Sequence, residues 1–375
     1  MQETVVVLGG RAPAALDLAR ALARSGRRVV AAESLRWPLT RFSNAVARSV
    51  RVAPPRQQTD RFLRDLRAVV REEGAVRVIP TCEEVFYAAR ATDLPVGSPP
   101  MRLLARLHDK AAFASLAASH GLAVPETHRL TSESDLAPFQ AESDRWVFKP
   151  AFSRFGTATR VPPHSPGTLG ALRPTDAAPW VAQRFVAGPV VCAYAVAHAG
   201  RLAALAVYRT PYVAGRAGVW FRHERHDAVR AWVEALVAAE RITGQVAFDF
   251  VERSDRSVVV LECNPRATSG LHLLRDASGF ADAVMGEAPP TCIEPPERLA
   301  VRLSVPMLMA GRHAGMDAAW RRAWAGSRDA LLDPRDPRPA LGQLALGAEL
   351  ATVARRAGMS LLDASTHDIA WDGGR

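Results

Sequence analysis

The first hundred residues alternate between short apolar runs and longer amphipathic stretches. The run TVVVL is rich in β-branched residues and ends in two glycines, which predicts a buried parallel strand and a tight turn. The stretch APAALDLARALARSG predicts a helix, with Pro13 near its start and Gly26 just past its end. Strands RRVVAAES and VRVIPT, and helices near 59–73 and from about Glu83, continue the pattern. We therefore predict one doubly wound α/β domain over residues 1–105.

From residue 106 to residue 310 the pattern changes to the alternation typical of antiparallel strands. The segment LPVGSPP, rich in Pro and Gly, indicates a boundary before this region. KAAFASLAASHG predicts a helix, and RWVFK and PWVAQRFV predict strands. Two longer stretches, VVCAYAVAHAGRLAALAVYR and GQVAFDFVERSDRSVVVLECN, have the character of hairpins. We expect an α+β region, divided into residues 106–186 and 187–310.

The last part, residues 311–375, contains the Arg- and Trp-rich stretch DAAWRRAWAG, and we expect a small helical extension there. The sequence has no apolar run of membrane-spanning length, and MQETVVVLGG lacks the basic segment of a signal peptide. The cysteines are scattered without CxxC spacing, which argues against a disulfide framework or a zinc site. We therefore expect a cytoplasmic protein without a membrane partner.

The net charge of +10 raises the question of a nucleic-acid partner. The arginines, however, are interleaved with acids, as in RFLRDLRAVVREEGAVR, and no basic run with intervening aromatic residues stands out. We therefore do not expect nucleic acid as a partner. A general attraction for anionic ligands is compatible with the charge.

Two acidic side chains face each other in a predicted hairpin. With Asp255 and Arg256 as a two-residue turn in AFDFVERSDRSVVVLECNPR, Asp249 lies opposite Glu262. Asn264 points to the same face as Glu262. Like charges about 5 Å apart repel by about 3 kcal/mol at an effective dielectric of ~20, so a shared proton, an Arg or a cation must offset them. A set of oxygen ligands favours a hard divalent cation, and a solvated hairpin face is the alternative.

Lysine is almost absent from this chain. Of the 48 basic residues only Lys110 and Lys149 are lysines. Lys149 ends a predicted strand before a loop with Gly156, where backbone N–H groups could approach phosphate oxygens, and Lys110 begins a predicted helix. Lys is a compact point charge whereas Arg is a wide planar fork, so a narrow slot between phosphate oxygens would retain Lys. Retention by chance is the alternative.

The order of these features resembles the ATP-grasp superfamily. Lys110, Lys149 with its loop, and the acidic strand ECNPR carry the resemblance, which spans roughly residues 105–310. The domain before them resembles the pre-ATP-grasp domain. The intervals of 13 and 2 residues, from Asp249 to Glu262 and on to Asn264, are similar to the metal-ligand triad of several ATP-grasp ligases. The implied fold is an ATP-grasp fold with an N-terminal doubly wound domain and a helical C-terminal extension.

The resemblance also implies a role for each matching residue. The implied nucleotide-binding residues are Lys110, Lys149, Ser153, Gly156, Thr157, Gln183, Arg184 and Val186. The implied metal ligands are Asp249, Glu262 and Asn264, for one or two Mg²⁺ ions, with Mn²⁺ as an alternative. Arg266 and Lys149 are the implied catalytic residues, acting on the transferring phosphoryl group or the substrate carboxylate.

Further along, residues 208–224 are expected over the active site, as a lid that contacts anions or as a solvated loop. His272 either faces the substrate or is structural.

The expected function is that of an ADP-forming carboxylate–amine ligase. ATP activates a carboxylate as an acyl phosphate, and an amine then attacks to form an amide. The expected partners are ATP, a small carboxylic acid and an amine, with amino acids among the candidates, and a homodimer is left open. One alternative is activation of bicarbonate, as in carbamoyl-phosphate synthase or biotin carboxylase. The other is a non-catalytic nucleotide- or nucleic-acid-binding protein.

Overall fold

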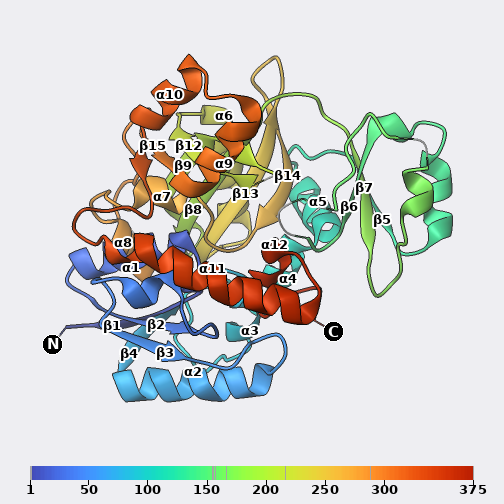
Figure 1. The fold of residues 1–375 in the computed structure, drawn as a ribbon. Helices are drawn as coiled ribbons and strands as arrows, with labels where there is room; N and C mark the ends of the chain where they lie inside the picture. Colours follow the sequence, from blue (N-terminus) through green and yellow to red (C-terminus); the bar gives the residue numbers. More distant parts are fainter. Residues whose placement is uncertain are drawn as a thin grey trace.

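The described residues form three sheets of four, seven and three strands, together with a two-stranded ribbon. The computed structural model describes residues 2–153, 156, 158–165, 167–215, 217–287 and 289–374. In Figure 1 the four-stranded sheet (blue) lies below the seven-stranded sheet, and the three-stranded sheet (green) lies to one side. The boundaries predicted after residues 105, 186 and 310 stay predictions.

The N-terminal sheet is parallel, in the order β3-β2-β1-β4. Its strands are β1 (Thr4–Leu8), β2 (Arg28–Glu33), β3 (Arg48–Arg51) and β4 (Ala75–Ile79). Alternate side chains of β1 enter two different cores, so that helix α1 (Pro13–Arg24) covers one face and α2 (Thr59–Glu73) covers the other (Figure 1). The predicted doubly wound arrangement is confirmed. The helix expected from Glu83 is only the short α3 (Val85–Ala88).

The three-stranded sheet is antiparallel, in the order β5-β7-β6. Its strands are β5 (Thr127–Leu130), β6 (Trp146–Pro150) and β7 (Trp180–Arg184). Helices α4 (Met101–His108) and α5 (Lys110–Ser119) precede it. The short 3-10 segments η2 (Glu133–Phe139), η3 (Ser143–Arg145) and η4 (Leu169–Ala171) connect these strands. Aromatic residues fill the small core of this part, with Phe139, Trp146 and Phe148 buried together.

The seven-stranded sheet has the order β14-β13-β8-β9-β12-β15-β16. Its strands are β8 (Val190–His198), β9 (Arg201–Arg209), β12 (Trp220–His223), β13 (Gly244–Glu252), β14 (Val258–Asn264), β15 (Ala300–Arg302) and β16 (Arg328–Asp329). The ribbon β10 (Val213–Ala214) and β11 (Ala217–Gly218) lies between β9 and β12 in the sequence. Strands β8 and β13 are apolar on both faces, as expected of strands inside a sheet, and they separate two cores.

The two faces of the large sheet have different partners. Helices α4, α5 and α6 (Asp227–Ala239) pack on one face, with Phe113 and Trp232 among the buried contacts. On the other face, α7 (Leu271–Leu274) and α8 (Phe280–Met285) share a core with α1. This core runs from Leu18 of α1 to Tyr194 of β8 without interruption. The N-terminal domain is therefore packed against the large sheet through a common hydrophobic core.

The hairpin of β13 and β14 pairs Asp249 with Glu262, as predicted. The predicted two-residue turn is wrong, because strand pairing continues to Glu252 and Val258 and the turn is longer. Arg256 adopts a φ of 64° within it, a conformation that accommodates a longer loop. A register shift next to Asp249 then restores the predicted pairing toward the end of β14. The bulge therefore aims both carboxylates toward one place.

The C-terminal region is mainly helical, with β16 added to the edge of the large sheet. Its helices are α9 (Ser304–Ala314), α10 (Ala318–Ala325), α11 (Arg338–Ala357) and α12 (Leu361–Ala364). Helix α11 crosses the N-terminal domain (Figure 1) and packs on the 3-10 segment η1 (Leu39–Phe42), where a side chain at Gly342 would clash with Phe42. The predicted helical character is confirmed.

After α12 the chain is tied to the N-terminal domain. Tyr87 Oη donates to the carbonyl of Ala370 at 2.5 Å, and Arg11 binds the carboxylate of Asp368. Trp371 stacks on Phe86 with ring centroids 4.4 Å apart. We call residues 365–372 the tail. Every helix in the described ranges is too short or too polar to traverse a lipid bilayer.

Candidate active site

A cavity of about 620 Å³ lies between the three-stranded sheet and the large sheet. Its walls come from β6, β7 and the loop after β6 on one side, and from β8, β9, β13 and β14 on the other. The sequence-predicted residues that line it are Lys149, Ser153, Gly156, Gln183, Arg184, Val186, Asp249, Glu262, Asn264 and Arg266. Residues from four separate stretches of the sequence therefore meet in one cavity.

Of the other two predicted residues, one lies outside the described part of the chain and one lies behind this wall. Thr157 lies outside the residues that the structure describes. Lys110 is buried behind the cavity, where its Nζ lies 3.4 Å from Oε2 of Glu262. The N-cap residue Asp109 accepts backbone hydrogen bonds from Ala111 and Ala112 and thereby fixes the start of α5. This cap holds Lys110 in place. Asp109 is itself fixed by Arg129, whose Nη1 donates to Oδ2 of Asp109 at 2.6 Å.

Lys149, on strand β6 of the three-stranded sheet, also reaches the carboxylate of Glu262. Its Nζ lies 3.7 Å from Oε2 of Glu262 and donates to the carbonyl oxygen of Leu261 at 3.3 Å. Burial lowers the pKa of Lys149 to about 8, although Glu262 opposes this shift. The two lysines of the chain therefore converge on one carboxylate, between the two sheets that form the cavity.

The opposed carboxylates Asp249 and Glu262 differ in their electrostatic environment. Burial raises the pKa of Glu262, but Lys110 and Lys149 outweigh it and lower the pKa to about 2. The pKa of Asp249 is raised to about 6, by burial and then by the charge of Glu262 opposite it. The lysines stabilise the charged form of Glu262. The repulsion between the two carboxylates, which the sequence predicted, therefore raises the pKa of Asp249. A cation at Asp249 would relieve it.

Asn264 and Arg266 continue the wall beyond Glu262. Nη2 of Arg266 donates a long hydrogen bond of 3.4 Å to Oδ1 of Asn264 and lies 3.9 Å from Oε1 of Glu83. Nη1 of Arg266 donates to the carbonyl of Ala267 at 3.2 Å. The guanidinium is thus held loosely, next to the carboxylates of the hairpin.

Strand β7 supplies the opposite end of the cavity. Gln183 is buried and donates from Nε2 to Oγ1 of Thr127 at 3.1 Å and to the carbonyl of Leu261 at 3.3 Å. Arg184 lies over the ring of Trp146, with 5.4 Å between its guanidinium carbon and the ring centroid. Gln183 therefore bridges the small sheet to the bulge in β14, close to Lys149.

Several cavity residues gave no signal in the sequence. Cys192 and Tyr208 lie on the long apolar strands β8 and β9, where the pattern indicated only a core. The carbonyl of Leu261 receives both Lys149 and Gln183 because the bulge exposes it, and a bulge has no clear sequence signature. The only related signal in the sequence was the predicted pairing of Asp249 with Glu262, which lies next to the bulge.

The segment 208–224 contributes to the cavity through residues of the β10–β11 ribbon and its flanks. Arg209 is bound by Glu224 at 2.8 Å and by Glu252, so it is not a free anion-binding group. Arg216 lies outside the described residues. His272 is buried and bonded to Asp17 at 2.8 Å, which favours the structural interpretation.

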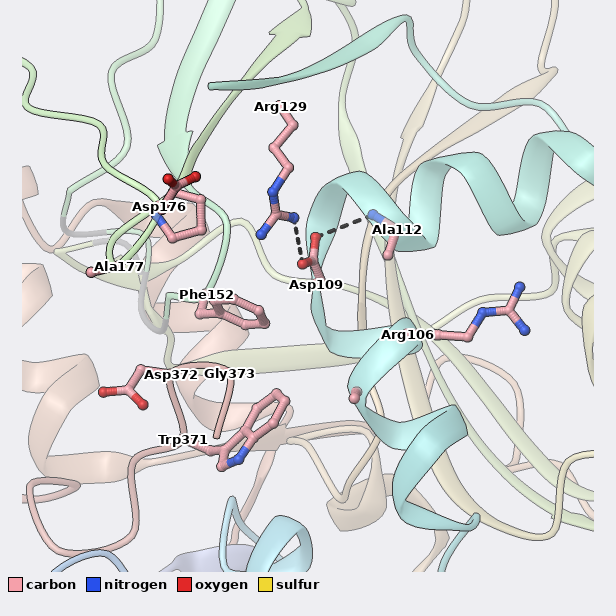
Figure 2. Close-up of a pocket in the computed structure, with 12 residues that line it drawn as sticks. Arg106, Asp109, Ala112, Arg129, Phe152, Asp176, Ala177, Trp371, Asp372 and Gly373 are labelled. Carbon is pink, nitrogen blue, oxygen red and sulfur yellow. Dashed lines mark hydrogen bonds and ion pairs between the residues drawn. The ribbon is translucent and has the colours of Figure 1, made fainter. Parts of the chain in front are cut away.

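A second cavity of about 300 Å³ adjoins the first, and the two share Arg266, Thr268 and Ser269 in their walls. A third cavity of about 340 Å³ lies at the outer side of α5 (Figure 2). Figure 2 shows Phe152 and Trp371 facing one another there, beside the Asp109–Arg129 pair. None of the predicted site residues lines the third cavity. It matters for the site because Phe152, three residues after Lys149, packs there against Trp371.

The residues of the main cavity fit a nucleotide and a hard divalent cation. Its volume lies within the usual range for small-molecule sites, ~300–1,000 Å³. The candidate ligands are two carboxylates and an amide, all with oxygen donors, as Mg²⁺ prefers. In the described part of the chain no three His, Cys, Asp or Glu side chains form a closed metal site. A cation at the hairpin would therefore need ligands from Asn264 and from the bound molecule.

Comparison with known proteins shows which family of domains the residues around the main cavity resemble. Residues 107–270 match the model of the ATP-grasp domain. Among the curated proteins none matches. The chain therefore contains an ATP-grasp domain, and Asp249, Glu262, Asn264 and both lysines lie within it.

Solved structures extend the likeness to most of the chain. Carboxyaminoimidazole ribonucleotide synthase from Aspergillus clavatus, complexed with ATP, has a TM-score of 0.64 and 14% identity, over 80% of this chain and 81% of that one. L-amino acid ligase from Bacillus licheniformis has a TM-score of 0.60 and 17% identity, over 76% and 73% of the two chains.

The biotin carboxylase domain of the 2-oxoglutarate carboxylase from Hydrogenobacter thermophilus, in complex with MgADP and bicarbonate, has a TM-score of 0.62 and 12% identity, over 78% and 72%. At these identities the three similarities establish the fold, which is the ATP-grasp fold with its N-terminal α/β domain.

Proposed function

We propose that the protein is an ATP- and Mg²⁺-dependent ligase that activates a carboxylate as an acyl phosphate and joins it to an amine, releasing ADP. The observation that carries the proposal is the convergence of both lysines of the chain on the Asp249–Glu262 hairpin, in a cavity between the two sheets. The L-amino acid ligase among the similar folds supports this reaction class.

Each residue has a definite task in this proposal. Lys149 neutralises phosphate oxygens from the cavity wall, and Lys110 adds its positive charge from behind Glu262. Glu262 keeps both ammonium groups in position before the nucleotide arrives. Asp249 and Glu262, with Asn264, hold Mg²⁺, because the two opposed carboxylates and the amide present oxygen ligands to one cavity.

The ends of the cavity have separate tasks. Gln183 and the backbone beside Arg184 and Val186 contact the adenine, and Ser153 and Gly156 lie over the phosphates. Arg266 holds the substrate carboxylate, since its guanidinium faces the cavity next to Asn264. ATP supplies the phosphoryl group when it is bound.

The test is Mg²⁺-dependent ADP release in the presence of carboxylic acids and amines, followed by mass spectrometry of the products. The screen covers the amino acids and small carboxylic acids, each with and without an amine. An amide product and ADP release that depends on both substrates would support the proposal. A rate of ADP release that stays the same whichever acid or amine is added would contradict the proposal.

The similarity to the biotin carboxylase domain with bound bicarbonate favours one second candidate, activation of bicarbonate. The same cavity residues would serve that reaction, with Arg266 next to the smaller acid. ADP release with bicarbonate alone, without an amine or a larger acid, distinguishes it from the ligase. Salt-sensitive DNA binding without any ADP release would instead favour a non-catalytic protein.

A further inference from the structure

The second cavity, next to Arg266, has walls of a different character from the first. We infer that it binds the apolar body of the carboxylic acid, so that the enzyme prefers small monocarboxylic acids with a hydrophobic tail. This inference rests on the proposed function and names its substrate class. Three residues, Arg266, Thr268 and Ser269, line both cavities, so the two cavities meet at Arg266.

Apolar side chains from distant parts of the sequence line the second cavity. Pro13 comes from the start of α1, Leu303 precedes α9, Leu346 and Leu350 come from α11, and Ile369 lies in the tail. Leu303, Leu346 and Leu350 are only partly buried, so each keeps apolar surface for a ligand. Burial of further apolar surface on these residues is favourable. This part of the wall therefore favours a hydrophobic group. Hydroxyl groups of Thr81, Ser365 and Thr366 also line the cavity, and each donates to a backbone carbonyl of the protein.

The charged groups around this cavity are already occupied, except for Arg266. The guanidinium of Arg11 donates to Glu33, Asp368, Ser34 and the carbonyl of Ser365. It cannot bind a second anion without breaking these bonds.

The other charged groups are also committed. His272 is bonded to Asp17, and Oε2 of Glu83 accepts the backbone N–H of Trp371 at 3.0 Å. Arg266, by contrast, has only long hydrogen bonds to Asn264 and Ala267, and its nearest carboxylate oxygen is 3.9 Å away. Arg266 is therefore the one cation in the described wall that can take up a substrate carboxylate.

This distribution of charge and surface selects among substrate classes. A phosphorylated substrate or a dicarboxylic acid would place a second anion against apolar side chains, where an unpaired charge is costly. Bicarbonate has no apolar part to fill the cavity. A volume of about 300 Å³ lies at the lower end for ligand sites, which indicates a small acid.

The test is hydroxylamine-trapped ligation with ATP and Mg²⁺, over the straight-chain acids from acetate to octanoate. The rate constant kcat/KM is expected to rise roughly fourfold for each methylene until the cavity is full. Succinate, the dicarboxylic counterpart of butyrate, is expected to react more slowly than butyrate. Leu350→Phe should shift the best acid to a shorter chain and Leu350→Ala to a longer one.

A matched control lies on the same helix. Leu344 is 77% exposed and lines neither cavity, so Leu344→Phe should leave the chain-length profile unchanged. A profile that is flat in chain length, or one that Leu350→Phe does not move, would overturn the inference while leaving the ligase activity intact.

Direct binding separates this inference from the failure of the proposed function. Calorimetric titration of hexanoate and succinate into the wild type, without turnover, is expected to show tighter binding of hexanoate. Leu350→Phe should abolish that difference, and Leu344→Phe should keep it. If no acid supports ADP release but hexanoate binds in this way, the reaction is wrong and the site is right. If hexanoate binds no better than succinate, the site assignment is wrong whatever the activity.

Discussion

Two buried carboxylates in this protein have opposite electrostatic surroundings. Asp17, on α1, has Arg275 at 3.0 Å, Arg20 at 3.2 Å and His272 at 2.8 Å. Burial raises its pKa, but the hydrogen bond and charge of His272 and the neighbouring arginines outweigh it and lower the pKa to about 2. Asp249 lies across from Glu262, and its pKa is raised to about 6.

The difference separates a structural charge cluster from the one that we propose is functional. Around Asp17 the charges are saturated within the protein, so the cluster fastens α1 to the segments around α7 and β16. Around Asp249 the two lysines form their ion pairs with Glu262. Burial and the charge of Glu262 outweigh the attraction of Lys149 and Arg266 for Asp249, so its pKa stays raised. Burial alone therefore does not mark a site, whereas an uncompensated buried charge that faces a cavity does.

The largest expected effect is the loss of activity in Asp249→Asn. We expect ADP release to fall by about 10³-fold, because the amide cannot supply the negative charge that holds Mg²⁺. Stability at pH 7 should stay unchanged or rise, since a repelled carboxylate is removed. The two measurements are ADP release and urea unfolding. A large loss of stability in this variant would show that Asp249 is a structural group like Asp17.

The matched substitution at the other cluster is Asp17→Asn. It removes the buried carboxylate that Arg20, Arg275 and His272 share, although Arg20 keeps Asp336 and Arg275 keeps Asp276 and Asp333. We expect the free energy of unfolding to fall by about 3 kcal/mol. Urea unfolding measures this loss, and ADP release by the folded fraction should stay near the wild-type value. Equal stabilities of Asp17→Asn and Asp249→Asn would remove the distinction between the clusters.

Lys149→Arg tests whether the shape of the cation matters. The charge is retained, but the planar guanidinium does not fit the place of an ammonium between Glu262 and the carbonyl of Leu261. We expect ADP release to fall about 10²-fold, with little change in thermal unfolding. Arg184→Lys, in the same cavity but over the ring of Trp146, is the reverse exchange for comparison. Normal turnover by Lys149→Arg would refute the argument from lysine shape.

The smallest effect concerns the pH dependence of stability. The pKa of Asp17 is about 2 in the folded protein against an ordinary 3.8, so the unfolded chain binds a proton first as the pH falls. The stability that Asp17 contributes is complete above pH 3.8 and is lost as the pH falls toward 2, by about 2 kcal/mol. Unfolding of the wild type and Asp17→Asn at several pH values should therefore converge in acid. A constant difference down to pH 2 would contradict the assigned pKa.

The sequence predicted those parts of the fold and site that depend on local pattern. The strand pairing of Asp249 with Glu262 followed from the hairpin and is confirmed, even though the turn and the bulge that produce it were not foreseen. The scarcity of lysine indicated both ammonium groups, but it could not place Lys110 behind Glu262 rather than in the cavity wall.

Contacts between distant segments had no such signal. The pairing of Arg11 with Asp368, and the meeting of Pro13 with Leu350 in one cavity wall, join residues more than 300 positions apart. The periodicity of a segment does not predict which distant segment packs against it. An amphipathic pattern indicates that one face is buried, but it does not indicate which residues cover that face. The second cavity could therefore be found only in the folded chain.

The tail has a consequence for the order in which the molecule is made. Residues 365–372 leave the ribosome after the segments that they hold, and Trp371 packs between Phe86 and Phe152. A nascent chain can form the two N-terminal sheets early, but the loop after Lys149 and the wall next to Arg266 lack their outer support until the tail arrives. The proposed substrate site is therefore complete only after this segment has been made, and a chain interrupted before Trp371 should be folded in its sheets yet incomplete at that site.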